Sequence, residues 1–257
     1  MLFDVEKYRI IDCHMHPYLM HHRNFPFPLP ETYDEFFAEE QRTGITYCCG
    51  AFNIFNDGSD FAVIEECNKN VLDVHSKYPE LYYPGVNIHP NFPEESIREI
   101  QKFYDMRFRW IGEIASYVMN YKAYACEGMF PILEHAQSLN MVLNLHPTNL
   151  DDIVQLAVNF PRLKIVIAHP DNCGIMEGYQ AAQKYDNLYF DLSGRGLFRW
   201  GMLKKGIEMI GAERILFGTD YSVLNPAMYV AGVMFEHISE SERQLIFRDN
   251  FLRITEC

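Results

Sequence analysis

The sequence predicts a single (β/α)8 TIM barrel that spans residues 1–257. Eight short, β-rich apolar runs recur along the chain, and each is followed by a loop and a segment with helical spacing. No change in composition and no Ser/Gly linker divides the chain. Near-continuous apolar runs are typical of parallel strands that are covered on both faces. A length of 257 residues also suits one closed barrel.

The predicted strands are runs rich in Val, Ile, Leu and aromatic residues. They cover residues 8–14, 45–52, 81–88, 108–115, 141–146, 163–169, 187–193 and 214–220. Because these runs alternate with helical segments, they indicate βαβ units in order and a parallel sheet.

The helical segments between the strands differ in the strength of their signals. The strongest is 59–79, where one stripe holds Phe61, Ile64, Cys67, Val71 and Val74. The segment 32–44 has Thr32 placed for a helix start and Gly44 for a stop. The segment 201–211 is interrupted by glycine and has the weakest signal.

Composition and charge disfavour several classes of partner. With 22 basic and 35 acidic residues the net charge is −13, and no long run of Lys or Arg could follow a phosphate backbone or an anionic membrane surface. The apolar runs are far shorter than the ~20 residues of a membrane-spanning helix, and the N-terminus lacks a signal-peptide pattern. Seven scattered cysteines suggest small buried hydrophobes in a reducing compartment. We therefore expect a soluble cytoplasmic protein with a small-molecule partner, and a homo-oligomer is left open.

Histidines and acids stand where the predicted strands end. The first strand runs into IDCHMH, where His14 and His16 are two residues apart and therefore share one face. Glu113 interrupts the apolar run WIGEIA. The fifth, sixth and eighth strands end with His146, His169 and Asp220. Because the active site of a parallel barrel lies at the carboxyl ends of its strands, we expect these side chains to converge.

These residues together indicate a metal site. Taken singly, each is more often a hydrogen-bonded core or loop residue. Taken jointly, they would set unpaired acids and imidazoles side by side, which is costly unless a cation lies among them. Imidazole nitrogen and carboxylate oxygen are ligands of zinc and of manganese, iron and cobalt, so one or two such divalent ions are predicted, zinc first. Asp12, one layer below His14, is predicted to orient a ligand histidine.

The same segments resemble the amidohydrolase superfamily, in its amidohydrolase-related branch. The resemblance rests on IDCHMH, the lone His146 and His169, LFGTDYS and RDNFLRI, and it spans nearly the whole chain. It implies a metal-dependent barrel in which His14, His16 and Asp220 bind one metal. His146 and His169 would then bind or flank a second.

Two arrangements of this site remain open. The fourth strand lacks the carbamylated lysine of many two-metal relatives, but Glu113 stands where related hydrolases use a bridging glutamate. The preferred arrangement has two metals with Glu113 between them. In the other, one metal is held by His14, His16, His146 and Asp220, and His169 acts as acid or base.

The predicted activity is metal-dependent hydrolysis of an ester, lactone, amide or cyclic amide. A bound cation lowers the pKa of water from 15.7 to about 7, and Asp220 could take its proton and pass it to the leaving group. The alternative is a one-metal, non-oxidative decarboxylase of an unsaturated or aromatic acid. A non-catalytic metal-binding barrel is the third and least favoured interpretation.

Further residues at the rim are predicted substrate contacts. They are His89, Asn53 and Arg195. Arg195 could hold a carboxylate bidentately, or it could pair with Asp191 or another rim acid. For His89 and Asn53 the competing interpretation is an ordinary loop role.

The loop 18–30 is predicted to lie over the mouth of the site. Prolines at positions 26, 28 and 30 forbid a helix there and favour an extended course. Its function is predicted to be that of a lid, with an ordinary surface loop as the alternative.

Overall fold

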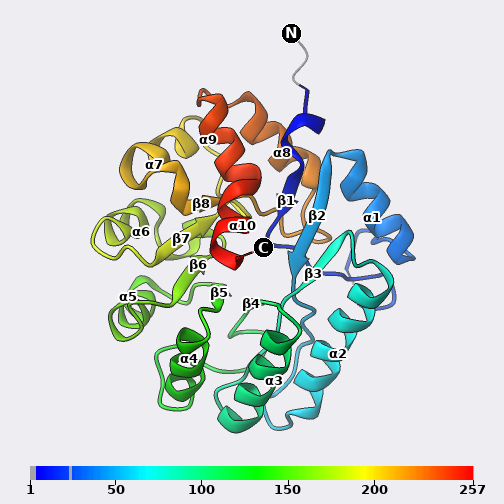
Figure 1. Ribbon diagram of the computed structural model, residues 1–257, viewed down its shortest axis with the longest axis vertical. Coiled ribbons are helices and arrows are strands. Elements are labelled where there is room, and N and C mark those ends of the chain that lie inside the picture. The colour runs from blue at the N-terminus through cyan, green and yellow to red at the C-terminus, as the bar shows by residue number, and fades with distance from the viewer. Residues whose placement is uncertain (1–3, 23–24, 257) are drawn as a thin grey trace.

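A computed structural model describes residues 4–22 and 25–256, and it confirms the predicted barrel (Figure 1). Figure 1 looks along the barrel, with strands at the centre and helices around them. The strands are β1 (Ile10–Asp12), β2 (Ile45–Gly50), β3 (Tyr82–Pro84), β4 (Trp110–Ile114), β5 (Val142–Leu145), β6 (Lys164–Ile167), β7 (Leu188–Asp191) and β8 (Ile215–Leu216). Each lies inside one of the runs predicted from the sequence.

The strands form two hydrogen-bonded arcs that join into one barrel. β1 to β3 form the first arc and β4 to β8 the second, and all paired neighbours are parallel. Single bridges connect the arcs, from Val86 to Ile111 on one side and from Met15 to Tyr221 on the other. The carboxyl ends of all eight strands therefore meet at one end of the barrel.

The helices form the outer ring of the barrel. They are α1 (Tyr33–Arg42), α2 (Ala62–Lys77), α3 (Pro93–Asp105), α4 (Met129–Ser138), α5 (Leu150–Asn159), α6 (Ile175–Ala182), α7 (Met202–Ile210) and α8 (Pro226–Phe235). Of these, α1, α2 and α7 lie inside the predicted segments 32–44, 59–79 and 201–211. The Thr32 side chain caps α1 by accepting from the Glu35 amide at 3.2 Å, as its position predicts. α7 forms despite its weak signal, because a Cβ at Gly206 would lie 2.8 Å from the Tyr179 hydroxyl and glycine lets α7 approach α6 closely.

The last segments of the chain close the other end of the barrel. They are α9 (Glu240–Gln244), a π-helical turn (Leu245–Asp249) and α10 (Asn250–Thr255). Phe251 packs against Trp110, the first residue of β4, with ring centroids 5.4 Å apart. The Asn250 amide donates to the carbonyls of Ala212 and Ile215 at 2.7 and 2.8 Å. These segments therefore pack across the end where the strands begin, opposite the end where the strands finish.

The cysteines of the described ranges form no disulfide and are mostly buried. Of the six cysteines described there, all are free thiols and five are buried, namely Cys13, Cys48, Cys49, Cys67 and Cys173. This burial agrees with their interpretation as small hydrophobes. Within the same ranges no helix has the length and apolar character needed to span a membrane.

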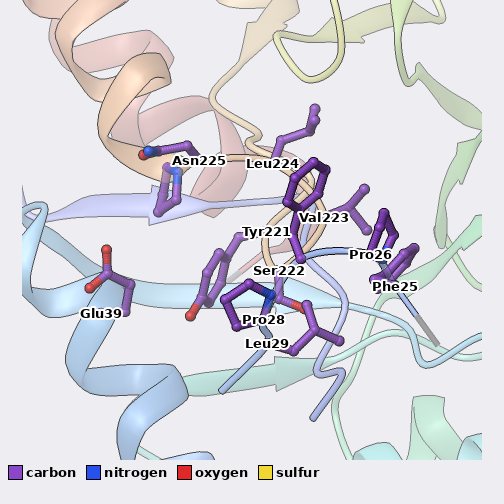
Figure 2. A pocket seen from close by; sticks show the side chains of 12 residues that line it. Phe25, Pro26, Pro28, Leu29, Glu39, Tyr221, Ser222, Val223, Leu224 and Asn225 are labelled. Atoms are coloured by element: carbon purple, nitrogen blue, oxygen red, sulfur yellow. The ribbon is translucent and has the colours of Figure 1, made fainter. Parts of the chain in front are cut away.

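The proline-rich loop after β1 faces the segment after β8. Residues 25–30 form no helix, as predicted, whereas residues 23 and 24 of the predicted loop lie outside the described ranges. Between residues 25–29 and residues 221–226 lies a pocket of about 690 Å³, which we call the apolar groove (Figure 2). The groove lies beside the open end of the barrel.

Candidate metal centre

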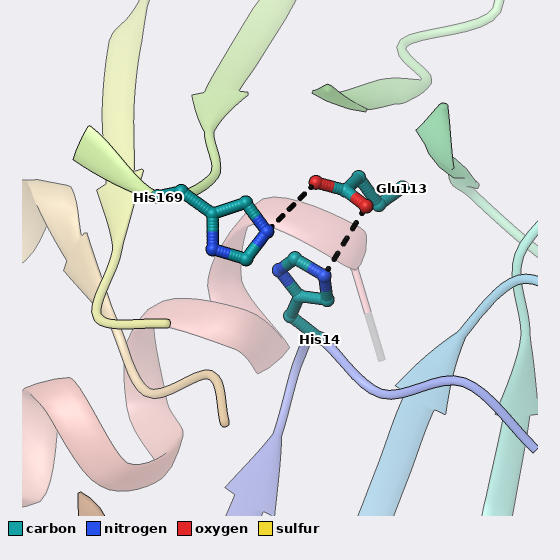
Figure 3. A group of neighbouring side chains, drawn as sticks. All are labelled: His14, Glu113 and His169. Atoms are coloured by element: carbon teal, nitrogen blue, oxygen red, sulfur yellow. Dashed lines mark ion pairs between the residues drawn. The ribbon is translucent and has the colours of Figure 1, made fainter. Parts of the chain in front are cut away.

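The six predicted ligand residues come together at the open end of the barrel. They are His14, His16, Glu113, His146, His169 and Asp220. Glu113 Oε2 lies 3.5 Å from His14 Nε2 and 3.4 Å from His16 Nε2. Glu113 Oε1 lies 3.2 Å from both His146 Nδ1 and His169 Nε2. The carboxylate of Glu113 is thus surrounded by four imidazoles, two of which are drawn in Figure 3.

Backbone geometry at the ends of β6 and β8 directs two of these side chains. His169 and Asp220 have φ angles of +46° and +63°, in the left-handed region that side chains other than glycine rarely adopt. Such conformations cost about 1–3 kcal/mol and are concentrated at functional sites. A Cβ at Gly194 would lie 2.5 Å from His169 Nδ1, so the glycine lets the loop after β7 press against this imidazole.

Hydrogen bonds to the Nδ1 atoms of His14 and His16 orient both rings so that Nε2 faces the centre. His14 Nδ1 donates to Asp191 Oδ2 at 2.9 Å, and His16 Nδ1 donates to the Ala51 carbonyl at 2.7 Å. A carboxylate and a carbonyl can only accept, so both Nδ1 atoms carry the proton. In the neutral imidazoles the Nε2 lone pairs therefore point at Glu113, as metal-bound histidines require.

His169 is oriented through a serine. Ser193 Oγ donates to Asp191 Oδ1 and lies 3.1 Å from His169 Nδ1. Because the hydroxyl has only one proton, it accepts from His169 Nδ1, and His169 Nε2 is left unprotonated towards Glu113. Asn144 Nδ2 adds a further bond to Asp191 Oδ2 at 3.1 Å. Asp191 thus supports His14 directly and His169 through Ser193.

The sequence assigned this supporting role to the wrong aspartate. Asp12 accepts from the backbone amides of His14 and Thr219 at 3.0 and 3.1 Å, so it holds the backbone and does not orient an imidazole. The sequence predicts Asp191 only as a possible partner of Arg195. Its signal in the sequence is the one used for Glu113, a carboxylate within an apolar run. Ser193 carries no comparable signal.

The electrostatics of the cluster favour a positive charge among its acids. Burial opposes protonation of His14, yet the carboxylates of Glu113 and Asp191 raise the pKa of His14 well above its usual range. Burial would raise the pKa of Glu113, but the charge of His14 and bonds to the imidazoles lower it well below its usual range. For Asp220, burial prevails and raises the pKa. A proton or a metal ion can supply the positive charge.

The donor atoms fit a divalent metal. His14 Nε2, Glu113 Oε1 and His146 Nδ1 are buried without a hydrogen-bond partner among the described residues. Two groups of ligand atoms lie within 4.8 Å of one another, namely His14, Glu113 and His169, and His14, His16 and Asp220. Ligands about 2.1 Å from one ion lie roughly 3–3.5 Å apart, close to the contacts around Glu113. The cluster is therefore suited to a divalent cation.

His146 differs from the other three histidines. Asn172 Nδ2 donates to His146 Nε2 at 2.9 Å, so the neutral imidazole carries its proton on Nδ1, the nitrogen that faces Glu113. His146 also belongs to neither compact ligand group. This orientation suits a contact to Glu113 better than a metal bond. Asn172, which lies in the 3₁₀ helix Pro170–Cys173 after β6, was not identified from the sequence.

Two cavities open onto the cluster. The first, about 140 Å³, is lined by His16, Tyr18, Phe25, Asn53, Phe55, Glu113, Ala115, Tyr117, Val118, His169, Asp220 and Val223. The second, about 220 Å³, is lined by Tyr117, His146, His169, Asp171, Asn172, Gly194, Arg195 and Asp220. Tyr117, His169 and Asp220 line both, so a ligand in either cavity would face the candidate metal centre.

The predicted substrate contacts are distributed unequally over these cavities. Asn53 lines the first cavity and donates to the Glu113 carbonyl at 3.0 Å. Arg195 lines the second, and its partner is Asp171 at 3.5 Å, a rim acid other than Asp191.

His89 lines neither cavity. It is buried, with Nε2 donating to the Met119 carbonyl at 2.8 Å and Nδ1 accepting from the Asn91 amide at 3.1 Å. Both ring nitrogens therefore have protein partners. We correct the predicted substrate contact of His89 to a loop-positioning role.

Comparison with known proteins identifies the family. The model of the family described as Amidohydrolase matches residues 11–254. The chain belongs to the amidohydrolase family. No curated protein sequence matches it significantly.

Solved structures share the fold of this amidohydrolase. A 2,6-dihydroxybenzoate decarboxylase from Rhizobium has a TM-score of 0.77 and 17% identity, over 96% of this chain and 98% of that one. A 5-carboxyvanillate decarboxylase from Sphingomonas paucimobilis has a TM-score of 0.77 and 16% identity, over 97% and 99%. A dihydroxybenzoic acid decarboxylase from Polaromonas sp. JS666, with bound manganese and the inhibitor 2-nitroresorcinol, has a TM-score of 0.71 and 18% identity, over 88% and 86%.

These likenesses overturn one prediction. The sequence led us to expect a hydrolase, but the similar structures named above are decarboxylases of aromatic acids, so that prediction is wrong. The error came from taking Glu113 as evidence for a two-metal hydrolytic centre. At such low identity the likenesses establish the barrel fold alone, and membership of the amidohydrolase family rests on the family model.

Proposed function

We propose that this amidohydrolase-family protein is a metal-dependent, non-oxidative decarboxylase of aromatic carboxylic acids. One observation carries the proposal: the Nε2 atoms of three histidines and two carboxylates converge beside a small cavity with aromatic walls. Tyr18, Phe25, Phe55 and Tyr117 contribute those walls. A planar ring suits such walls, and its carboxylate suits a cationic centre. The decarboxylases that share the fold support the same reaction class.

One divalent ion would be held by His14, His16 and Asp220, with Glu113 and His169 within reach. When bound, the ion would supply positive charge to anchor and polarise the substrate carboxylate. Imidazoles mixed with carboxylates suit zinc, which the sequence favours, and manganese, which the Polaromonas structure contains. His146 belongs to neither compact ligand group, and its Nε2 is bonded to Asn172, so we assign one ion to the site.

The reaction breaks the bond between the ring carbon and the carboxylate. Carbon dioxide leaves, the electron pair stays on the ring carbon, and a proton then joins that carbon. Asp220 lines both cavities and is the group that we assign to deliver the proton. His169 lines the same two cavities, and its Nε2 lies 3.7 Å from Asp220 Oδ2. The aromatic walls keep water away from the reacting carbon.

The test uses the metal-loaded protein with 2,6-dihydroxybenzoate, 5-carboxyvanillate, an aryl ester and a lactone. In heavy water, at least one of the two acids should release carbon dioxide. The product should carry deuterium at the carbon that lost the carboxylate. Metal analysis should give one equivalent per chain. Asp220→Asn should abolish release, whereas Asp171→Asn at the rim should retain most of it. Hydrolysis of the ester or lactone without carbon dioxide release from either acid would refute the proposal.

A further inference from the structure

The apolar groove adjoins the first cavity of the candidate metal centre. Phe25 and Val223 line both spaces, and in Figure 2 both lie on the side of the groove opposite Glu39. The groove measures about 690 Å³ and the cavity about 140 Å³. Small-molecule sites usually measure about 300–1,000 Å³, so the cavity alone is small for a site and the groove is not.

One short turn connects the metal centre to the groove. Asp220 is a candidate ligand, and its carbonyl accepts from the amides of Val223 and Leu224 at 2.9 and 3.0 Å. Residues 221–226, which follow directly, form one wall of the groove. A molecule that reaches from the metal centre past Val223 would therefore enter the groove without crossing another element.

The chemistry of the walls specifies what the groove can bind. Its walls are mainly apolar, from Phe25, Pro26, Phe27, Pro28, Leu29, Tyr221, Val223, Leu224 and Pro226. The charged side chain among its lining residues is Glu39, which Arg42 holds at 2.8 Å. An acid at this position disfavours a carboxylate there. An anionic substrate would therefore place its carboxylate at the metal centre and an uncharged, apolar part in the groove.

We propose that the groove binds the non-reacting part of the substrate, which is an aromatic acid with an extended apolar substituent. This inference rests on the proposed decarboxylase function, whose small cavity holds the reacting carboxylate. Phe25 and Val223 form the boundary that the substituent passes. The proline-rich loop after β1 then forms the side of the groove that selects acids with a long apolar substituent.

The experiment compares benzoate with 3-hexylbenzoate and 4-hexylbenzoate on the metal-loaded protein, by calorimetry. At least one hexyl compound should bind about tenfold tighter than benzoate, because its alkyl carbons are buried in the groove. Each buried CH₂ contributes about 0.8 kcal/mol, which is nearly a fourfold gain in affinity. Leu224→Trp should fill the groove and remove the preference for the hexyl compounds over benzoate. Met228→Trp, a control on the 70% exposed Met228 of α8, should keep the preference.

A second variant protects the test against misfolding of Leu224→Trp. Val223→Ala widens the boundary and should strengthen the preference for the hexyl compound. Equal affinity of wild-type protein for all three benzoates would overturn the groove assignment. Sedimentation that shows a dimer in wild-type protein and a monomer in Leu224→Trp would also overturn it, because a second copy would then cover the groove.

The outcomes separate this inference from the proposed function. A hexyl preference without carbon dioxide release from any acid would support the groove as a binding site and refute the decarboxylase. Release from 2,6-dihydroxybenzoate without a hexyl preference would support the decarboxylase and refute the groove assignment.

Discussion

Glu113 and Glu40 are both buried glutamates, yet their environments shift their pKa values in opposite directions. They are 3% and 1% exposed. Burial raises the pKa of each, and for Glu40 the nearby Asp12 raises it further, to well above its usual range. For Glu113 the charge of His14 and bonds to the surrounding imidazoles outweigh burial and lower the pKa well below its usual range. The neighbours, not the degree of burial, decide which buried acid keeps its charge.

The partners of the two carboxylates differ accordingly. Neither oxygen of Glu40 has a hydrogen-bond partner among the described residues. Glu113 has a ring nitrogen from four histidines within 3.5 Å. A buried acid that stays neutral adds nothing to a metal site, whereas one that stays ionised among imidazoles completes it. This contrast separates the candidate metal centre from an isolated polar residue in the core.

The largest expected effect comes from removing the charge of Glu113. Glu113→Gln keeps the shape of the side chain but leaves the imidazoles without their central carboxylate. We expect metal affinity to fall more than about 100-fold, beyond the 10- to 100-fold typical of groups that only support a ligand. Titration with zinc and manganese followed by calorimetry measures this.

Glu99→Gln is the matched control for this change. Glu99 is also a buried glutamate, but its partners are Asn68 and Lys102. Its substitution should leave metal affinity unchanged. Equal losses in the two variants would mean that Glu113 contributes only to folding.

A smaller effect is expected from Asp191→Asn. The amide no longer fixes the proton of His14 on Nδ1, so part of the population would turn a protonated Nε2 to the centre. Metal affinity should fall about 10- to 100-fold. Asp12→Asn is the control, because Asp12 binds the His14 backbone and burial already raises its pKa to about 7. A larger loss in Asp12→Asn would reverse the roles that we assign to the two aspartates.

The fold and the ligand residues could be predicted because both follow from local patterns. Apolar runs gave all eight strands, and the rule that sites lie at the carboxyl ends of barrel strands brought His14, Glu113 and Asp220 together. α7 was the weak case, since the reason for Gly206 is its contact with Tyr179 on another helix. Such a contact has no trace in the local sequence.

The finer properties of the site could not be predicted, because they depend on hydrogen bonds between distant residues. Asp191 lies 177 positions from His14, and no spacing rule links them. Asn172 decides which nitrogen of His146 faces Glu113, and only a three-dimensional contact reveals it. The mistaken hydrolase prediction had the same origin, since it used the position of Glu113 without the protonation of its neighbours.

Glu40→Met tests the second of the two buried glutamates through the free energy of unfolding. The folded protein keeps a proton on Glu40 that the unfolded chain releases above about pH 4.5, so stability should fall as pH rises from there towards the raised pKa. An apolar side chain of similar size removes this pH dependence and also the cost of the unpaired oxygens. The free energy of unfolding should therefore rise by about 1–2 kcal/mol at neutral pH. Thermal unfolding from pH 5 to 8 measures it. The half-exposed Glu39→Met is the control, and a stability loss in Glu40→Met would indicate an ionised, paired Glu40.

Ser193→Ala should have the smallest effect and tests how far the support of the imidazoles extends. The hydroxyl transmits the charge of Asp191 to His169 Nδ1 over 3.1 Å, and its loss leaves that nitrogen without its acceptor. A hydrogen bond contributes about 1 kcal/mol net, so metal affinity or turnover should fall about fivefold. Ser193→Thr keeps the hydroxyl and should restore most of the loss, which a purely structural role would not require. A loss as large as that of Asp191→Asn would mean that Asp191 acts mainly through His169 and not through its direct bond to His14.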